Sequence, residues 1–406
     1  MSNTNSNPNQ PRLLSFTLDG WTVLGGQVSV SLQNGVVVLV GRNGAGKSAI
    51  LEGFESISSR AIGRFVRIRP TNQDTIPKIL NIEILTPEDR KLKYRYEVIS
   101  LVTSTDETDI DDPTSDNSEG NQFSWNDCCQ YVDGEQELLW TTKNGVTTFE
   151  NGGDSIITIL GNTSSLRRTT LPENSPIQLP SEMQWIRDVL NGVRLLGKNS
   201  IRQTSRRISS LLVVSSRGIY PNRGLADILA RKIFRRKEAD ELDELENVCQ
   251  RVGLGKKITV KKLVQSEEPR EKTGEEEYFS VLLDGVNIGF LSDGTLRVLS
   301  ILIEIMTPYP SPTIIIEEPE TQIHPGMLEK LLNEIEAYTF GENLILSTHS
   351  PQVVAWTSPK NINLVHRKDG QTFVRKLGED EIQNVIEYIS DEGNLGEWIY
   401  SGILDE

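Results

Sequence analysis

Hydrophobic and polar residues alternate along the first part of the chain, and this alternation predicts antiparallel strands. Residues 13–18 and 27–32 both place apolar side chains at every second position, as half-buried strands do. Val36–Val40 is instead continuously apolar, β-branched and bounded by glycine, which predicts a parallel strand buried on both faces. Residues 78–100 predict two more strands around a turn.

The middle of the chain changes to the spacing of helices. Between residues 182 and 254, apolar residues such as Trp185, Ile186 and Val189 recur three and four positions apart. The last third alternates between the two patterns, predicting a helix over 294–306, a strand over 313–316, a helix over 325–339 and a strand over 344–346. Strands and helices that alternate in this way form a parallel sheet, so we expect an α/β fold.

A glycine-rich loop follows directly after the buried strand. Residues 41–48 read GRNGAGKS, which fits G-x-x-x-x-G-K-S, and they precede apolar residues spaced as in a helix. In this setting backbone N–H groups wrap phosphates, Lys47 reaches the β- and γ-phosphates, and Ser48 holds Mg²⁺. The predicted binding residues are Asn43, Gly44, Ala45, Gly46, Lys47, Ser48 and Ala49.

Two acids end the apolar strand at 313–316. The carboxyl edge of a parallel sheet is where such folds bind ligands, and Glu317 and Glu318 come at that edge. Mg²⁺ bound to phosphates favours a carboxylate, which suits Glu317, and in-line attack by water needs a base, which suits Glu318. An apolar run followed by two acids is a weak signal alone, but paired with the phosphate-binding loop it becomes strong.

A third loop lies shortly before this strand. Ser292, Asp293 and Gly294 stand at the start of the helix predicted over 294–306, where free N–H groups can bind an anion. Taken alone, this is an ordinary helix N-cap.

The charge of the chain is strongly uneven. The net charge is −15, from 42 Lys and Arg against 57 Asp and Glu, so any nucleic-acid contact requires a local basic patch. Residues 198–237 provide one, with Asp227 as their single acid. This segment either contacts a phosphate backbone or forms a solvated face that pairs with acids such as those of 238–246. Its bases are Lys198, Arg202, Arg206, Arg207, Arg217, Arg223, Arg231, Lys232, Arg235, Arg236 and Lys237.

An acidic segment lies upstream of the basic one. Residues 101–142 contain no Lys or Arg and are rich in Asp, Ser and Asn near their start. Such a composition favours a solvated surface loop, and the alternative is a nucleic-acid mimic or a regulatory arm.

The remaining composition favours the cytoplasm. Cys128, Cys129 and Cys249 cannot make a disulfide framework, which fits a reducing compartment. The longest apolar runs are far shorter than a bilayer span, and the polar N-terminus lacks the apolar core of a signal peptide. We therefore expect a cytoplasmic protein that does not enter a membrane.

The combination of motifs resembles the ABC-type ATPases, in which a P-loop, a signature loop, a Walker B strand and a switch histidine follow in this order. LSDGT at 291–295 stands where that family has LSGGQ, and STHSP at 347–351 resembles its switch-histidine strand. The resemblance implies that Glu318 is the general base, that Glu317 replaces the usual metal-site aspartate, and that His349 contacts the γ-phosphate.

Within that superfamily the chain is most similar to the RecF/SMC-like and OLD-like branch, which includes standalone AAA-type ATPases of bacterial defence loci. EEPETQIHP at 317–325, STHSPQ at 347–352 and NLGEW at 394–398 resemble motifs of this branch, and His324 falls where many members carry the D-loop aspartate. The resemblance covers residues 13–60 and 280–400. The chain after His349 is too short for the TOPRIM nuclease domain of OLD nucleases, so a nuclease would be a separate protein.

The resemblance implies an ATP- and Mg²⁺-dependent ATPase that closes as a head-to-tail homodimer, alone or within a higher oligomer. ATP would lie between the P-loop of one subunit and Ser292, Asp293 and Gly294 of the other. We expect it to act as a sensor or regulator in antiphage defence or DNA maintenance, gating a separate effector and touching nucleic acid through 198–237. The alternatives are a nucleotide-controlled scaffold that binds no nucleic acid and, third, a transporter ATPase subunit.

The expected fold class is an α/β ABC-ATPase-like P-loop NTPase with an N-terminal antiparallel β subdomain and a helical insertion. The expected division is a tail over 1–12, a first ATPase half over 13–100, an acidic loop and hairpin insertion over 101–181, a basic helical insertion over 182–255 and a second ATPase half over 256–406.

Overall fold

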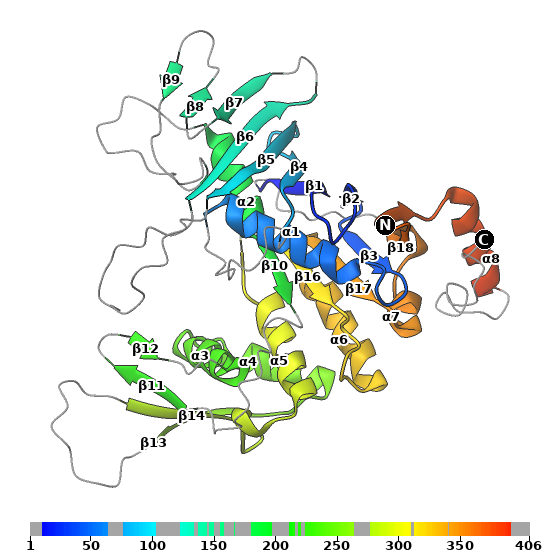
Figure 1. The fold of residues 1–406 in the computed structure, drawn as a ribbon. Helices are drawn as coiled ribbons and strands as arrows, with labels where there is room; N and C mark the ends of the chain where they lie inside the picture. The colour runs from blue at the N-terminus through cyan, green and yellow to red at the C-terminus, as the bar shows by residue number, and fades with distance from the viewer. Residues whose placement is uncertain are drawn as a thin grey trace.

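The protein is an α/β fold built around three sheets (Figure 1). The computed structural model describes residues 10–63, 76–102, 122–133, 137–143, 146–149, 155–157, 166, 180–196, 211–215, 218–220, 224–263, 277–309, 312–339 and 341–390. The NLGEW motif at 394–398 and most of the expected tail lie outside these residues.

The largest sheet is the expected N-terminal antiparallel one. Its strand order is β2-β1-β4-β5-β6-β7-β8-β9, so nearly every strand pairs with its neighbours in the sequence. Its strands are β1 (Arg12–Asp19), β2 (Val28–Ser31), β4 (Ile79–Leu85), β5 (Lys91–Val102), β6 (Gln122–Tyr131), β7 (Leu138–Lys143), β8 (Val146–Phe149) and β9 (Ser155–Ile157). The acidic segment 101–142 therefore supplies strands β6 and most of β7, while its most acidic part, 103–121, lies outside the described residues.

The second sheet is the parallel one that the last third of the sequence predicts. Its order is β10-β16-β17-β3-β18-β19, in which only the β18–β19 pair is antiparallel. Its strands are β3 (Val36–Val40), β10 (Val193–Leu196), β16 (Thr313–Glu317), β17 (Asn343–Thr348), β18 (Ile362–Lys368) and β19 (Gln371–Lys376). The register pairs Glu317 with Ser347 and Thr348 with Val40, so the three central strands end at one edge.

Helices cover both faces of this parallel sheet. They are α1 (Lys47–Ala61), α2 (Ser181–Asn191), α5 (Asp293–Ile305), α6 (Pro325–Tyr338) and α7 (Pro351–Trp356), while α8 (Glu379–Ser390) follows β19. Among the helices of the described residues, none is long and apolar enough to cross a membrane.

The third sheet, with order β12-β11-β14-β13, packs with helices α3 and α4. Its elements are β11 (Leu211–Ser215), β12 (Gly218–Tyr220), β13 (Ile258–Leu263), β14 (Glu277–Leu283) and the short β15 (Val286–Asn287), and the helices are α3 (Leu225–Glu238) and α4 (Leu242–Val252). The segment 182–255, expected to be a helical insertion, is thus only partly helical. Short apolar runs such as 211–214 fit a strand or a helix by periodicity alone, and here pairing with β14 decides for a strand.

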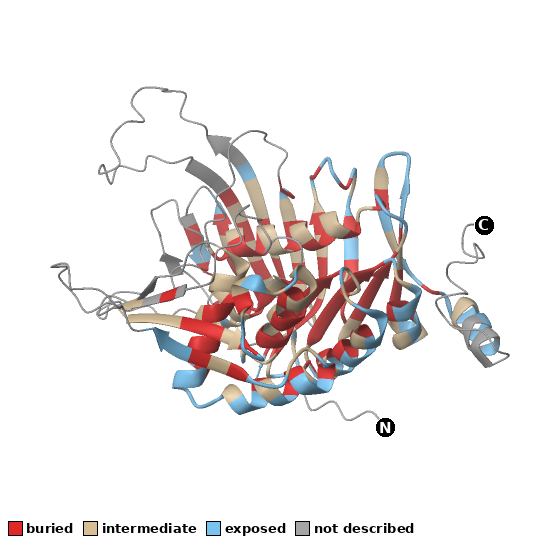
Figure 2. Cartoon of the chain, turned by 90° about the horizontal axis from the view of Figure 1, so that it is seen from below, coloured by how far each residue is buried: buried red, intermediate tan, exposed pale blue. Residues whose placement is uncertain are grey.

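Two hydrophobic cores meet across the parallel sheet. Successive side chains of a strand point to opposite faces, and β3 accordingly sends Val37 and Leu39 into one core and Val38 and Val40 into the other. The core that contains Val37 and Leu39, called the first core below, lies between this sheet, α1, α2 and the antiparallel sheet. The core that contains Val38 and Val40, the second core, lies beneath α3 to α7. Figure 2 shows the buried residues concentrated along the central strands. Both faces are buried, which explains the continuous apolar run of β3.

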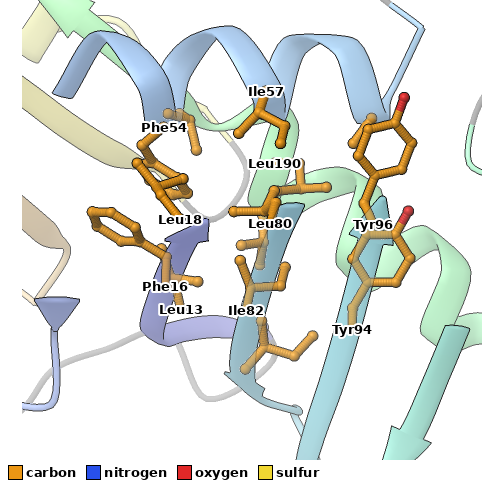
Figure 3. Packing of buried hydrophobic residues seen from close by; sticks show 14 of the residues in the cluster. Leu13, Phe16, Leu18, Phe54, Ile57, Leu80, Ile82, Tyr94, Tyr96 and Leu190 are labelled. Carbon is orange, nitrogen blue, oxygen red and sulfur yellow. The ribbon is translucent and has the colours of Figure 1, made fainter. Parts of the chain in front are cut away.

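Aromatic packing joins α1 to the antiparallel sheet. Phe54 on α1 stacks on Phe16 of β1 with ring centroids 3.9 Å apart and planes 6° apart, and both side chains are fully buried (Figure 3). Ile57 lies one turn further along α1 over the same sheet. This contact fixes the helix that begins in the glycine-rich loop.

Substitution Phe54→Ala is expected to destabilise the fold by about 3–5 kcal/mol, because it removes a fully buried ring and leaves a cavity against Phe16. The midpoint of urea unfolding measures this loss. Phe290, whose side chain is 58% exposed, is the matched control, and Phe290→Ala should change stability by less than about 0.5 kcal/mol. Equal midpoints for the two variants would contradict this view of the core.

Candidate functional site

The glycine-rich loop lies between β3 and α1, as its motif requires. Gly44 and Gly46 have positive φ angles of 82° and 105°, and α1 begins at Lys47. A Cβ atom on Gly46 would lie 2.4 Å from Oγ1 of Thr372 on β19, so the β18–β19 hairpin packs directly on the loop. The loop therefore has the left-handed glycines and the adjoining helix N-terminus that phosphate-binding loops use.

Lys47 is buried at the centre of the site. Its side chain is 5% exposed, and its Nζ donates hydrogen bonds to the carbonyl oxygens of Gly41 at 2.6 Å and Arg42 at 3.1 Å. Burial lowers the pKa of Lys47, and the negative charges of Glu318, Glu320 and Glu317 oppose this shift. The lysine thus lies within the electrostatic influence of all three carboxylates.

Ser48 and Glu317 meet across the site. The Ser48 hydroxyl donates to Oε1 of Glu317, which comes from the end of β16. Glu317 is only 2% exposed, and its Oε2 is buried without a hydrogen-bond partner among the described residues. A hydroxyl beside a buried, under-satisfied carboxylate fits Mg²⁺, which prefers oxygen ligands. No cluster of three or more His, Cys, Asp or Glu side chains in the described residues could hold a metal alone.

Glu318 has an unusual backbone. Its φ angle is +45°, in the left-handed region that non-glycine residues rarely adopt, and its N–H donates to the carbonyl of Ser347 at 2.9 Å. Its carboxylate accepts a long hydrogen bond from Thr321 Oγ1 at 3.4 Å and is 27% exposed. This backbone turn directs the carboxylate away from the strand while Glu317 remains buried at its end.

His349 lies beside this carboxylate. Its Nδ1 atom is 3.4 Å from Oε1 of Glu318 and equally far from Oε1 of Glu320. Glu320 also accepts hydrogen bonds from Thr348 Oγ1 at 2.7 Å and from the His349 N–H at 3.1 Å. Sequence reasoning assigned no role to Glu320, although it stands in the quoted EEPE motif.

A second residue that the sequence analysis missed is Arg297 on α5. Its side chain is 6% exposed, and Nη2 donates to the carbonyl oxygens of Glu317 at 2.5 Å and Glu318 at 2.9 Å. Burial lowers the pKa of Arg297, opposed by the charges of Glu317, Glu320 and Glu318. Its one signal in the sequence is that it is the single charged residue of a mainly apolar segment, 296–303.

The signature-like loop packs against the turn that follows Glu318. Ser292 caps α5 by accepting a hydrogen bond from the Thr295 N–H at 3.2 Å, and Asp293 stands in the first turn of the helix. A Cβ on Gly294 would lie 2.2 Å from the carbonyl oxygen of Gln322. His324 caps α6 in a similar way, with Nδ1 accepting from the Gly326 N–H, so this residue has a structural role in the turn.

The structure therefore brings P-loop residues together with Glu317, Glu318 and His349, as the sequence predicts for a single site. Among the remaining predicted residues, Asn43 is exposed, Ala49 packs on the first core, and the carbonyl of Ala45 accepts from Thr372 Oγ1 at 3.2 Å. Their roles in ligand binding stay predictions.

Two bases of the segment 198–237 serve the fold itself. Lys232 forms an ion pair with Glu304, and burial lowers its pKa to about 8. Arg236 is 9% exposed and contacts Glu241 at 3.4 Å. Arg235 is exposed, whereas the bases from 198 to 210 lie outside the described residues. Of the two alternatives for the segment 198–237, pairing with acids of the same chain therefore applies to Lys232 and Arg236.

Substitution Gly46→Ala is expected to weaken ATP binding at least about tenfold more than Gly44→Ala. Both glycines have positive φ, but a Cβ on Gly46 would also collide with Thr372, while a Cβ on Gly44 would meet no atom within 4 Å. Titration with a fluorescent ATP analogue compares the two affinities. Equal losses would show that the β18–β19 hairpin does not constrain the loop.

Comparison with known proteins gives a family and a set of distant structures. Residues 36–139 and 191–355 match the family model described as "AAA domain, putative AbiEii toxin, Type IV TA system". No curated protein matches this sequence.

Three solved structures of SMC head domains are similar to the chain. An Smc head bound to the C-terminal winged-helix domain of ScpA is 14% identical (TM-score 0.41; 92% of this chain and 100% of that chain). A head with an extended coiled coil, bound to the C-terminal domain of ScpA from Pyrococcus furiosus, is 14% identical (TM-score 0.39; 94% and 100%). The head from Thermotoga maritima is 13% identical (TM-score 0.37; 90% and 99%).

The family model covers most of the described chain, including the P-loop, the strand that ends in Glu317 and the loop that carries His349. The protein belongs to this AAA-domain family.

Proposed function

We propose that this protein binds ATP with Mg²⁺ and hydrolyses it to ADP and phosphate. The observation that carries the proposal is the convergence of Lys47, the Ser48–Glu317 contact and the Glu318–His349 pair at one edge of the parallel sheet. In a purely structural role a buried acid is expected to have its hydrogen bonds satisfied, whereas Oε2 of Glu317 has no partner among the residues that the structure describes.

The residues divide the chemistry among them. Lys47 and the inward N–H groups of the loop neutralise the phosphates, while Ser48 and Glu317 would hold Mg²⁺, whose charge stabilises the transferring phosphoryl group. Glu318 accepts a proton from the attacking water as the water oxygen bonds to the γ-phosphorus and the bond to the ADP oxygen breaks. His349, next to Glu318, contacts the γ-phosphate and completes the site.

The second part of the proposal is a head-to-tail homodimer. Ser292, Asp293 and Gly294 of one subunit would complete the ATP site of the other, so that ATP favours closure and hydrolysis releases it. We propose that this cycle makes the protein a cytoplasmic sensor or regulator in antiphage defence or DNA maintenance, gating a separately encoded effector.

A specific observation favours a second candidate, a nucleotide-controlled scaffold that binds no nucleic acid. Lys232 and Arg236 are engaged by Glu304 and Glu241, and the net charge is −15. Fewer bases of the segment 198–237 are then available for phosphates than the sequence suggests. A transporter ATPase subunit stays third, since its basis is the motif order alone.

Substitution Glu318→Gln is expected to lower the steady-state ATP turnover by about 10²–10⁴-fold while ATP binding is retained, because the amide cannot accept the proton of the attacking water. Phosphate release and ATP-analogue titration measure the two quantities. Glu336→Gln, an exposed acid on α6, is the control and should leave turnover unchanged. Turnover of the Glu318 variant equal to that of the wild type would remove the general base from the proposal.

Nucleic-acid binding separates the two candidates. If the basic segment contacts a phosphate backbone, duplex DNA should bind more weakly as the salt concentration rises. A plot of the logarithm of the association constant against the logarithm of the salt concentration should have a slope of about −0.9 for each phosphate contact. Replacing Arg202, Arg206, Arg207 and Arg235 together by Gln should then flatten this slope; Arg236 is left intact because the fold uses it.

The control for this experiment removes the same charge elsewhere. Lys78, Lys91, Lys93 and Lys143 are exposed bases on or beside the antiparallel sheet, and replacing them by Gln should leave the slope unchanged. An equal effect of both sets, or no binding by the wild type, would favour the scaffold. Fluorescence anisotropy with a labelled duplex at several salt concentrations gives the slopes.

A further inference from the structure

Two carboxylates contact the same histidine nitrogen but differ in how firmly they are held. Nδ1 of His349 lies 3.4 Å from Oε1 of both Glu318 and Glu320. The Glu320 side chain is 11% exposed and accepts two hydrogen bonds at 2.7 and 3.1 Å, whereas that of Glu318 is 27% exposed and accepts one at 3.4 Å. Glu320 is therefore the fixed partner of His349, and Glu318 is the less constrained one.

The hydrogen bonds of Glu320 hold the backbone on both sides of His349. Thr348, fully buried at the end of β17, accepts a hydrogen bond from the Ser350 N–H at 2.9 Å, so its own hydroxyl hydrogen donates to Glu320. The N–H of His349 donates to the same oxygen. Ser350 in turn caps α7. The carboxylate thus joins the turn after β16 to the turn after β17, with His349 at the junction.

This arrangement matters because Oε1 of Glu318 contacts His349, while a general base must offer a carboxylate oxygen to the attacking water. If a second carboxylate holds the imidazole, Glu318 can turn toward the water without leaving Nδ1 without a partner. A histidine that is contacted at Nδ1 presents Nε2 as its second nitrogen. Glu320, whose Oε1 lies 3.4 Å from Nδ1, supplies that contact independently of Glu318.

We propose that Glu320 is a positioning residue that holds the imidazole of His349 and thereby frees Glu318 to act on water. The inference rests on the proposed ATPase activity. It assigns two of the three acids of the EEPE motif to separate tasks: Glu318 accepts a proton from water, and Glu320 orients the histidine.

A double-mutant cycle in the full-length protein tests the proposal. Glu320→Ala should lower the turnover number by about 10- to 100-fold with little change in the affinity for an ATP analogue, because misplacement of a contacting group by about 1 Å costs this much. His349→Ala should give a loss of at least that size. The double variant should be no slower than His349→Ala, since Glu320 acts through the histidine.

Two further variants separate positioning from folding. Glu320→Gln keeps an oxygen that can accept from Thr348 and from the His349 N–H, so it should retain more turnover than Glu320→Ala. Glu246 on α4 is the matched control, because its side chain is also 11% exposed and accepts a backbone N–H, that of Ile258, at 2.8 Å. Glu246→Ala should leave the turnover number unchanged, even if it shifts the unfolding midpoint as much as Glu320→Ala does.

The outcomes are distinct. If the wild type does not hydrolyse ATP, or if Glu318→Gln hydrolyses it equally fast, the proposed activity itself fails. If the wild type turns over ATP and the losses of Glu320→Ala and His349→Ala multiply, Glu320 does not act through His349 and the inference is overturned. A loss in Glu246→Ala equal to that in Glu320→Ala would likewise overturn it, since a general structural effect would then explain both.

Discussion

The candidate site exists because three parallel strands keep one register. Pairing of Glu317 with Ser347 and of Thr348 with Val40 ends β16, β17 and β3 at the same level of the sheet. The loops that follow these strands therefore leave from one edge, and each carries a different group: two acids, a histidine and the glycines of the P-loop motif. If the pairing register of β16 shifted by one residue, each of its side chains would move to the opposite face of the sheet. Ile316 would then lie where Glu317 now meets Ser48.

Charge balance is the second constraint on this edge. Three carboxylates, those of Glu317, Glu318 and Glu320, gather between two buried cations, Lys47 from the loop before α1 and Arg297 from α5. The surplus of negative charge suits a divalent cation more than a bare polyphosphate. Arg297 also donates to the carbonyls on both sides of the turn at Glu318, so hydrogen bonds join the helix after Ser292 to the acidic loop.

Much of this organisation was predictable from the sequence, because periodicity and motif spacing are local properties. Val36–Val40, the strand ending in Glu317 and the helices that flank them occur where their patterns predict. Glu320 and Arg297 were not identified, since their roles depend on partners in other elements, and β11 was missed because a short apolar run becomes a strand only through its pairing with β14. The ligand-binding roles of the predicted residues stay predictions.

The position of β3 in the sheet has a consequence for biosynthesis. Both of its neighbours, β17 and β18, are translated about 300 residues later. At typical elongation rates, the nascent strand waits on the order of 15–60 s before either partner leaves the ribosome. During that time a continuously apolar, β-branched segment has no edge to pair with. The strand order therefore exposes this chain to aggregation during synthesis, a hazard that is separate from the stability of the finished fold.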